Sequence, residues 1–217
     1  SDLEHEQGYR VTEIVDFTEF ETHAKFLEGT GSMVLDRVNR KAYAALSERT
    51  DYRALEHFCS AFGYEAVAFN AFQNVEGQRL PIYHTNVMMS IGTGFAAVCL
   101  ESIDDPKERE SVASQLRSDG LELIELSEAQ IEEFAGNMLE LQSGGIHYVV
   151  LSERAFRSLH PQQIEQIEQH NKEIIKSISK IDMPTLSSLL TAKFSQCEKL
   201  NYVCDICNDY VGKNSRA

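Results

Sequence analysis

The sequence lacks the features that mark membrane-spanning, secreted and nucleic-acid-binding proteins. No apolar run approaches the roughly 18 residues that cross a bilayer. The first residues, Ser-Asp-Leu-Glu-His-Glu, have neither the basic nor the apolar region of a signal peptide. Basic residues number only 20 against 34 acidic ones, which gives a formal net charge of -14. This charge offers no electrostatic support for nucleic acid or anionic membranes as partners, so we expect neither.

Cysteine is also scarce, and its number is odd. Of the 5 cysteines, Cys59 and Cys99 lie in apolar segments and are expected to be buried, reduced thiols. The low density predicts a reducing compartment, with the cytoplasm as the default location. The chain also begins without methionine, so we expect a processed chain or a fragment. Its 42% apolar and 25% charged content is typical of an ordinary globular protein.

A unit of about fifty residues occurs three times along the chain, and it is the clearest sign of organisation. Each copy begins with a short apolar run, a polar or Gly-bearing turn and a second apolar run, which predicts a β-hairpin. The first runs begin near Met33, Met88 and Met138. Met88, Met89 and Met138 are expected to belong to the core.

A helical pattern follows each hairpin. The expected helices lie at 50–62, 105–118 and 152–169, and Pro161 should break or restart the last of them. Strands are expected after the first two helices, at 65–69 and 121–125. The sequence therefore predicts an α/β fold of three ββαβ units.

Such units are stable when they close on one another, which places the loops before their first strands around a common axis. Polar residues in these loops, Glu28, His84 and Asn137, should then converge. A closed ring needs more than three units, so the chain looks incomplete.

Three segments in these loops carry a resemblance to a known family. They are residues 26–33 (Phe-Leu-Glu-Gly-Thr-Gly-Ser-Met), 83–89 (Tyr-His-Thr-Asn-Val-Met-Met) and 134–140 (Phe-Ala-Gly-Asn-Met-Leu-Glu). They resemble signature segments of the pentein superfamily of arginine deiminases and amidinotransferases, closest to its citrulline-utilisation hydrolase branch. The resemblance covers residues from about 10 to 170 and implies an α/β propeller of five ββαβ modules, of which this chain holds about three.

The resemblance implies a role for each polar residue. Glu28 would orient the substrate and the histidine, and His84 would be the general acid and base, a role that suits imidazole near neutral pH. Asn86 stands where guanidine-processing relatives carry Asp. A neutral amide can bind a neutral ureido group without leaving a charge unpaired, which favours citrulline over arginine. Asn137 is a further substrate-binding candidate, although an Asn before a strand often only caps a turn.

The family pattern also requires a nucleophilic cysteine in a Gly-rich segment, and the residues after about 175 do not resemble one. Without that thiolate no covalent intermediate forms, so the chain alone is expected to be inactive. The tail carries Cys204 and Cys207 in a Cys-x-x-Cys pattern that resembles half of a zinc finger. Two thiolates are half a tetrahedral site, so the pair is only a weak metal candidate, and no cofactor is implied.

We therefore expect a partial pentein catalytic domain at 1–172 and a segment of uncertain origin at 173–217. The predicted function is that of a fragment of a hydrolase acting on the ureido or guanidino group of citrulline or an arginine-like small molecule. Two alternatives stay open, a catalytically dead binding module and an amidinotransferase. Open strand edges and axis-facing apolar residues are expected to promote self-association; these residues are Met33, Leu35, Met89, Ile91 and Met138.

Overall fold

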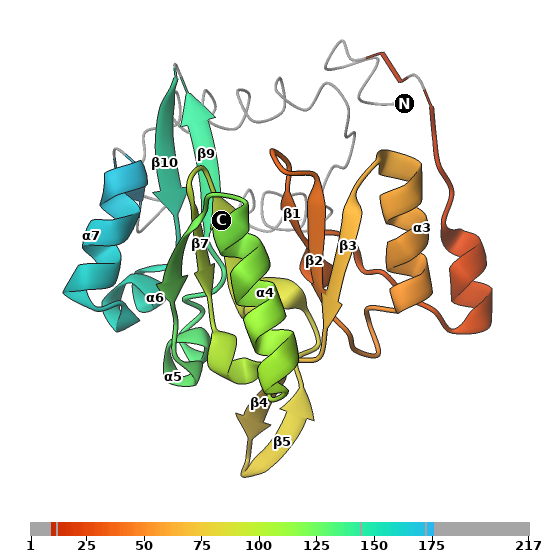
Figure 1. The fold of residues 1–217 in the computed structure, drawn as a ribbon, viewed down its shortest axis with the longest axis horizontal. Coiled ribbons are helices and arrows are strands. Elements are labelled where there is room, and N and C mark those ends of the chain that lie inside the picture. Colours follow the sequence, from red (N-terminus) through yellow and green to blue (C-terminus); the bar gives the residue numbers. More distant parts are fainter. Residues whose placement is uncertain (1–9, 12, 144, 172, 176–217) are drawn as a thin grey trace, which may run out of the picture.

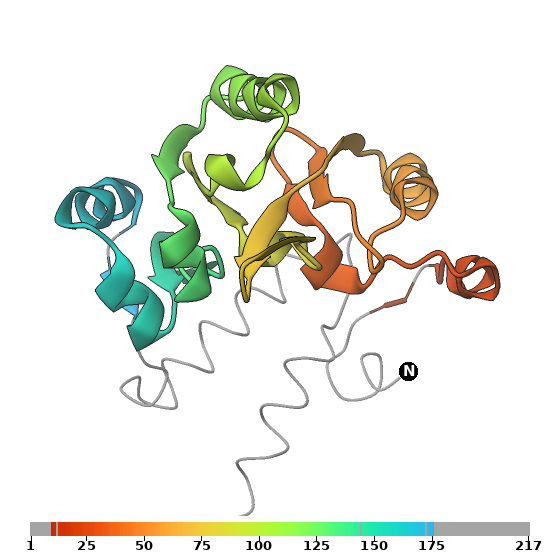
Figure 2. The ribbon, with the colours of Figure 1, turned by 90° about the horizontal axis from the view of Figure 1, so that it is seen from below.

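The computed structural model describes residues 10–11, 13–143, 145–171 and 173–175. Its strands form three three-stranded sheets and one separate hairpin. The three sheets stand side by side in an arc, with helices α3, α4 and α7 on the outside (Figures 1 and 2). On the inside, the first strand of each sheet lies against the first strand of the next, so β1 contacts β6 and β6 contacts β9. The expected ordering of first strands around an axis is therefore confirmed.

Each sheet is one ββαβ unit. In the first, β1 (Val34–Asp36) pairs antiparallel with β2 (Lys41–Ala45), and β2 pairs parallel with β3 (Glu65–Phe69) after helix α3 (Tyr52–Phe62). The second repeats this with β6 (Met89–Gly92), β7 (Phe95–Val98) and β8 (Glu122–Glu125), and its connection holds η3 (Leu100–Ser102) and α4 (Pro106–Ser118). The third contains β9 (Leu139–Ser143), β10 (Ile146–Val150) and β11 (Glu173–Ile175), joined through α6 (Glu153–Ser158) and α7 (Pro161–His170).

The helix ends follow local signals in the sequence. Asp51 caps α3 by accepting hydrogen bonds from the backbone N–H groups of Arg53 and Ala54, and the helix stops at Gly63 with a φ of 66°. Asp105 caps α4 in the same way, with proline at the first helical position. Pro161 begins α7 and separates it from α6, so the expected restart is confirmed.

Several elements were not predicted. They are β11, the hairpin of β4 (Phe72–Val75) and β5 (Gln78–Pro81), and the short helices η1 (Thr18–His23), α2 (Gly29–Ser32), η2 (Thr85–Val87) and α5 (Glu128–Glu132). Because β11 pairs with β10, residues 173–175 belong with the third unit, beyond the boundary at 172 that the sequence suggested. The rest of the predicted C-terminal segment lies outside the described residues, and the domain division stays a prediction.

The first strands begin at Val34, Met89 and Leu139, later than the apolar runs 31–36, 86–91 and 136–141 that predicted them. The apolar run from 86 to 91 was interpreted as a single strand, but Asn86 and Val87 form the one-turn helix η2. The preceding Thr85 is buried, donates its hydroxyl to the carbonyl of Ser32 at 2.6 Å and accepts from the N–H of Ala45 at 2.8 Å. These long-range bonds tie the turn to the first unit, and no local pattern could reveal them.

The largest apolar cluster contains residues of all three units. Met88 and Met89 are fully buried in it, and Met138 packs partly buried against it. Met33 is also buried, in a smaller cluster beneath α3 that contains Phe58. The expectation that Met88, Met89 and Met138 belong to the core is confirmed, whereas Met33 was expected to face the axis. Within the described ranges no helix is long and apolar enough to cross a membrane.

Candidate functional site

Glu28 and His84 come from equivalent loops of the first and second units and meet in space. Each stands immediately before a one-turn helix, α2 or η2, that leads into the first strand of its unit. The Nε2 atom of His84 lies 2.8 Å from the Oε2 atom of Glu28. The predicted proximity of carboxylate and imidazole is therefore confirmed, whereas their catalytic roles stay predictions.

Buried hydroxyl groups hold the two loops together. Ser32 Oγ accepts from the N–H of Glu28 at 2.8 Å and donates to the carbonyl of Arg49 at 2.7 Å. The carbonyl of Ser32 in turn accepts from the Thr85 hydroxyl. Both hydroxyl residues are fully buried, so the loop of Glu28 is fixed directly to the loop of His84.

Gly31 allows the imidazole to lie against the backbone of the first loop. A Cβ atom at this position would stand 2.7 Å from Nδ1 of His84, closer than real contacts permit. The glycine in the 26–33 segment therefore has a steric reason, since any side chain would displace the ring. It is the close approach that requires glycine here.

The pair is partly open to solvent and has a cation beside it. The side chain of His84 is 18% exposed and that of Glu28 is 44% exposed. Arg49 Nη1 lies 3.6 Å from Glu28 Oε2, and its guanidinium is stacked 5.3 Å from the centre of the Tyr83 ring. Exposed ion pairs of this kind add little stability. With the proton on Nε2, the carboxylate of Glu28 accepts from the ring and fixes the imidazole orientation.

A cavity of about 310 Å³ opens beside His84. Its volume is at the lower end for small-molecule sites, which span about 300–1,000 Å³. Its lining joins the hairpin to loops of the second and third units; the residues are Gln73, Tyr83, His84, Asn86, Val87, Ile131, Glu132, Phe134 and Asn137. Three of the four predicted site residues thus border one cavity, and the fourth, Glu28, binds the histidine on its wall.

The third unit meets the second through backbone contact. A Cβ on Gly136 would lie 2.3 Å from the carbonyl oxygen of Val87, so only glycine allows the two loops this proximity. The N–H of Asn137 donates to the carbonyl of Phe134 at 3.0 Å, which closes a tight turn. Asn137 is therefore placed next to the turn that carries Asn86.

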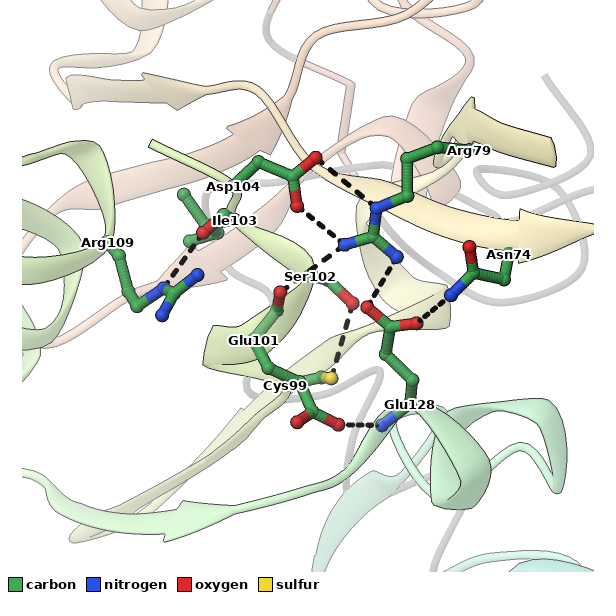
Figure 3. A network of polar contacts seen from close by, with 9 residues as sticks. All are labelled: Asn74, Arg79, Cys99, Glu101, Ser102, Ile103, Asp104, Arg109 and Glu128. Carbon is green, nitrogen blue, oxygen red and sulfur yellow. Dashed lines mark hydrogen bonds and ion pairs between the residues drawn. The ribbon is translucent and has the colours of Figure 1, made fainter. Parts of the chain in front are cut away.

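The hairpin β4–β5 contributes Gln73 and is anchored by Arg79 (Figure 3). Arg79 binds Asp104 at 2.6 Å and Glu128 at 2.5 Å, and Asn74 Nδ2 donates to the same Glu128 at 3.0 Å. The hydrogen bond from Arg79 lowers the pKa of Asp104 below its usual value.

Strand pairing explains how the anchored hairpin presents Gln73. Asn74 pairs with Arg79 on one face and Gln73 pairs with Leu80 on the other. Arg79 and Asn74 anchor one face of the hairpin, and Gln73 on the opposite face borders the cavity. The sequence signal for this hairpin was the turn at Glu76 and Gly77, both with positive φ as a type I′ turn requires.

Neither described cysteine can act at this cavity. Cys59 and Cys99 are buried, and burial raises the pKa of each thiol to about 11. Neither borders the cavity. Cys197 and the predicted Cys204 and Cys207 pair lie outside the described residues. In the described part of the chain, no group of three or more His, Cys, Asp or Glu side chains could hold a metal ion.

Comparison with known proteins identifies a family and a fold. The model of the eukaryotic N,N-dimethylarginine dimethylhydrolase family matches residues 2–187. The apo structure of ArgZ, an arginine dihydrolase from the ornithine-ammonia cycle in cyanobacteria, is similar with a TM-score of 0.55 and 15% identity over 79% of this chain and 24% of that one.

Two further solved structures are similar to this chain. The substrate-bound N-terminal domain of ArgZ (C264S mutant) has a TM-score of 0.54 and 15% identity over 81% of this chain and 56% of its own. Unliganded AgrE has a TM-score of 0.52 and 17% identity over 87% of this chain and 23% of its own. This chain therefore spans about half of the ArgZ domain, and the likeness establishes a shared pentein fold. No curated protein sequence matches this chain significantly.

Proposed function

The chain belongs to the eukaryotic N,N-dimethylarginine dimethylhydrolase family, and from this membership we propose that it forms part of a hydrolase acting on the guanidino group of an arginine-like substrate. One observation carries the proposal. The Glu28–His84 pair, with its 2.8 Å contact, stands on the wall of a cavity that Asn86 and Asn137 also border. A fixed imidazole with amide groups around it suits the binding of a planar, nitrogen-rich group.

The proposed reaction replaces one nitrogen of the guanidinium by oxygen. With His84 as the imidazolium, a thiolate adds to the central carbon, the departing amine takes a proton from His84, and the C–N bond breaks. Water then adds to the same carbon and gives a proton to His84, the C–S bond breaks, and a ureido product leaves. In our proposal Glu28 keeps the imidazole oriented through both steps.

We propose that the thiolate comes from a module other than the three described units, because Cys59 and Cys99 are buried away from the cavity. The chain would then bind substrate without turning it over, as expected from the sequence. Arg49 is the cation next to the pair, and we propose that it attracts the α-carboxylate of an amino-acid substrate. The reduced state of Cys59 and Cys99 supports our proposal of a cytoplasmic location.

A second candidate substrate is citrulline, and Asn86 is the residue that favours it. This neutral amide borders the cavity at the position where a carboxylate would pair with a guanidinium. Asn86 offers no charged partner to the guanidinium of a hydrolase or of an amidinotransferase substrate, so it does not separate these two activities. The remaining alternative is a binding module without chemistry, which differs from our proposal only in lacking a thiolate module.

Calorimetric titration of the full chain tests the proposal. We expect binding of N,N-dimethylarginine or L-arginine, with L-citrulline as the neutral comparison. His84→Ala should weaken binding at least tenfold, whereas His23→Ala, at an exposed histidine of η1, should leave it unchanged. Equal binding by wild type and His84→Ala would contradict the proposed site. Turnover to a ureido product in a protein that also carries the thiolate module would separate the hydrolase from the inactive binding module.

A further inference from the structure

Phe134 has an unusual backbone conformation at the rim of the cavity. Four described non-glycine residues have positive φ, namely Ala24, Arg40, Glu76 and Phe134, and of these Phe134, at 66°, is the one that borders the cavity. Its side chain is large and 51% exposed. A bulky residue in the left-handed region is strained, and such strain is concentrated at functional sites.

The local fold does not explain the choice of phenylalanine. Helix α5 ends at Glu132 with Glu133 as its C-cap, so Phe134 occupies the following position, where helices commonly end in a left-handed glycine. The N–H of Phe134 donates to the carbonyl of Ile131 at 2.9 Å, a bond that glycine would make equally well. The ring is half-exposed and borders the cavity, so it is available to a ligand there.

Tyr83 is a second exposed aromatic residue of the same lining. It is 45% exposed, and its ring centre lies 5.0 Å from that of His84. An arginine guanidinium lies over each of the two rings. The Cζ atom of Arg49 is 5.3 Å from the centre of the Tyr83 ring, and that of Arg154 is 5.4 Å from the centre of the Phe134 ring. Arg154 is held by Glu133 at 2.8 Å and is not part of the cavity lining. It therefore covers Phe134 from outside the cavity.

We propose that Phe134 and Tyr83 form an aromatic mouth that selects cationic ligands over neutral ones. The inference rests on the proposed function, in which a guanidinium cation becomes a neutral ureido group. The faces of aromatic rings attract cations through their quadrupole, whereas contact with the aliphatic chain is the same for both forms. The mouth thus holds the substrate more tightly than the product and favours product release.

The test compares two probes by calorimetry on the full chain, cationic N,N-dimethylarginine and neutral L-citrulline. Phe134→Leu should weaken binding of the cation by about threefold to thirtyfold, the range of a cation–π contact, and should weaken binding of citrulline by a clearly smaller factor. Tyr83→Leu should act in the same direction. Tyr52→Leu, at an exposed aromatic of α3 outside the cavity lining, is the matched control and should change neither affinity.

Phe134→Gly separates function from folding. Glycine relieves the backbone strain, so the melting temperature should be no lower than that of the wild type while cation selectivity is lost. Equal weakening of both probes, or no weakening of either, would overturn the aromatic mouth. In those cases the proposed function still stands if His84→Ala abolishes binding. Failure of the wild type to bind either probe would overturn both.

Discussion

At the scale of single residues, the site was predictable where the repeat constrained it. Glu28 and His84 stand at equivalent positions of two units, and this equivalence predicted their contact of 2.8 Å. Phe134 was not predictable in the same way, because an isolated aromatic before an apolar run is usually a core residue. Its positive φ and its exposure depend on where α5 ends, which the sequence pattern did not indicate.

The substitution Asn86→Asp tests how the site distinguishes charge. A carboxylate at this point of the lining makes a charge-assisted pair with a guanidinium, and it repels the carbonyl dipole of a ureido group. We expect the affinity ratio of L-arginine to L-citrulline to rise about tenfold, which corresponds to ~1.4 kcal/mol. Competition titrations on the two proteins measure it. An unchanged ratio would contradict the role given to Asn86.

Gly31→Ala tests the packing of the imidazole on the first loop. The added Cβ would stand 2.7 Å from Nδ1 of His84, so the ring must move away from Glu28. We expect at least a tenfold loss of ligand affinity, with a smaller effect on stability because the ring is partly exposed. Gly77→Ala is a useful comparison, since its Cβ would meet no atom within 4 Å, although its φ of 79° strains the turn. Similar ligand affinity in Gly31→Ala and in the wild type would show that the close contact between Gly31 and the His84 ring does not contribute to binding.

At the scale of elements, local sequence signals predicted helices α3 and α4 but missed the hairpin β4–β5. Helices α3 and α4 were predicted because an Asp cap and a following Gly are local features. The hairpin β4–β5 was missed because its strands carry polar residues such as Gln73 and Arg79 and show no apolar alternation. Its stability comes from side chains far along the chain, Asp104 and Glu128, which a periodicity analysis does not detect.

The substitution Arg79→Met should loosen the hairpin, because it removes the guanidinium that binds Asp104 and Glu128 and keeps an unbranched aliphatic side chain. Both ion pairs are partly exposed, so we expect the free energy of unfolding to fall by only about 1–2 kcal/mol. Ligand affinity should fall as well, since Gln73 would lose its fixed position. Lys107→Met removes a positive charge from α4 at a lysine outside the ion pairs of Arg79, and it serves as the comparison. An unchanged affinity would show that Gln73 is not positioned by Arg79.

Low pH should remove the stability that the ion pair between Arg79 and Asp104 provides. The pKa of Asp104 is lowered from 3.8 by Arg79. A group with a lowered folded-state pKa stabilises the fold above its unfolded value and loses this effect as the pH falls through the folded value. The difference in unfolding free energy between wild type and Arg79→Met should therefore be full at neutral pH and shrink below about pH 4. Denaturant titrations across this range measure it, and a constant difference would contradict the assignment.

At the scale of the whole molecule, the outer strands of the three sheets pair on one side only within the described part of the chain. Met33 and Met89, which were expected to face an unfilled axis, are buried, and Leu35, Ile91 and Met138 are half-buried. Large exposed apolar side chains lie elsewhere, with Val75 and Leu80 on the hairpin and Leu139 on β9. Edges and apolar side chains of this kind favour association.

We therefore propose that the isolated chain self-associates despite its net charge of -14. Sedimentation velocity over a range of protein concentrations tests this proposal, and we expect the mean sedimentation coefficient to rise with concentration. Charge repulsion should make the effect stronger at higher salt, where it is screened. A monodisperse monomer with cooperative unfolding at all concentrations would show that the arc is self-sufficient.

The central claim is that an arginine-like ligand binds in the cavity beside His84. Backbone amide spectra of the isotopically labelled chain, recorded during titration with N,N-dimethylarginine, test it most directly. We predict saturable shifts centred on His84, Asn86, Phe134 and Asn137, with their loss in His84→Ala. Shifts confined to the far side of the arc, or shifts that persist unchanged in His84→Ala, would contradict the account.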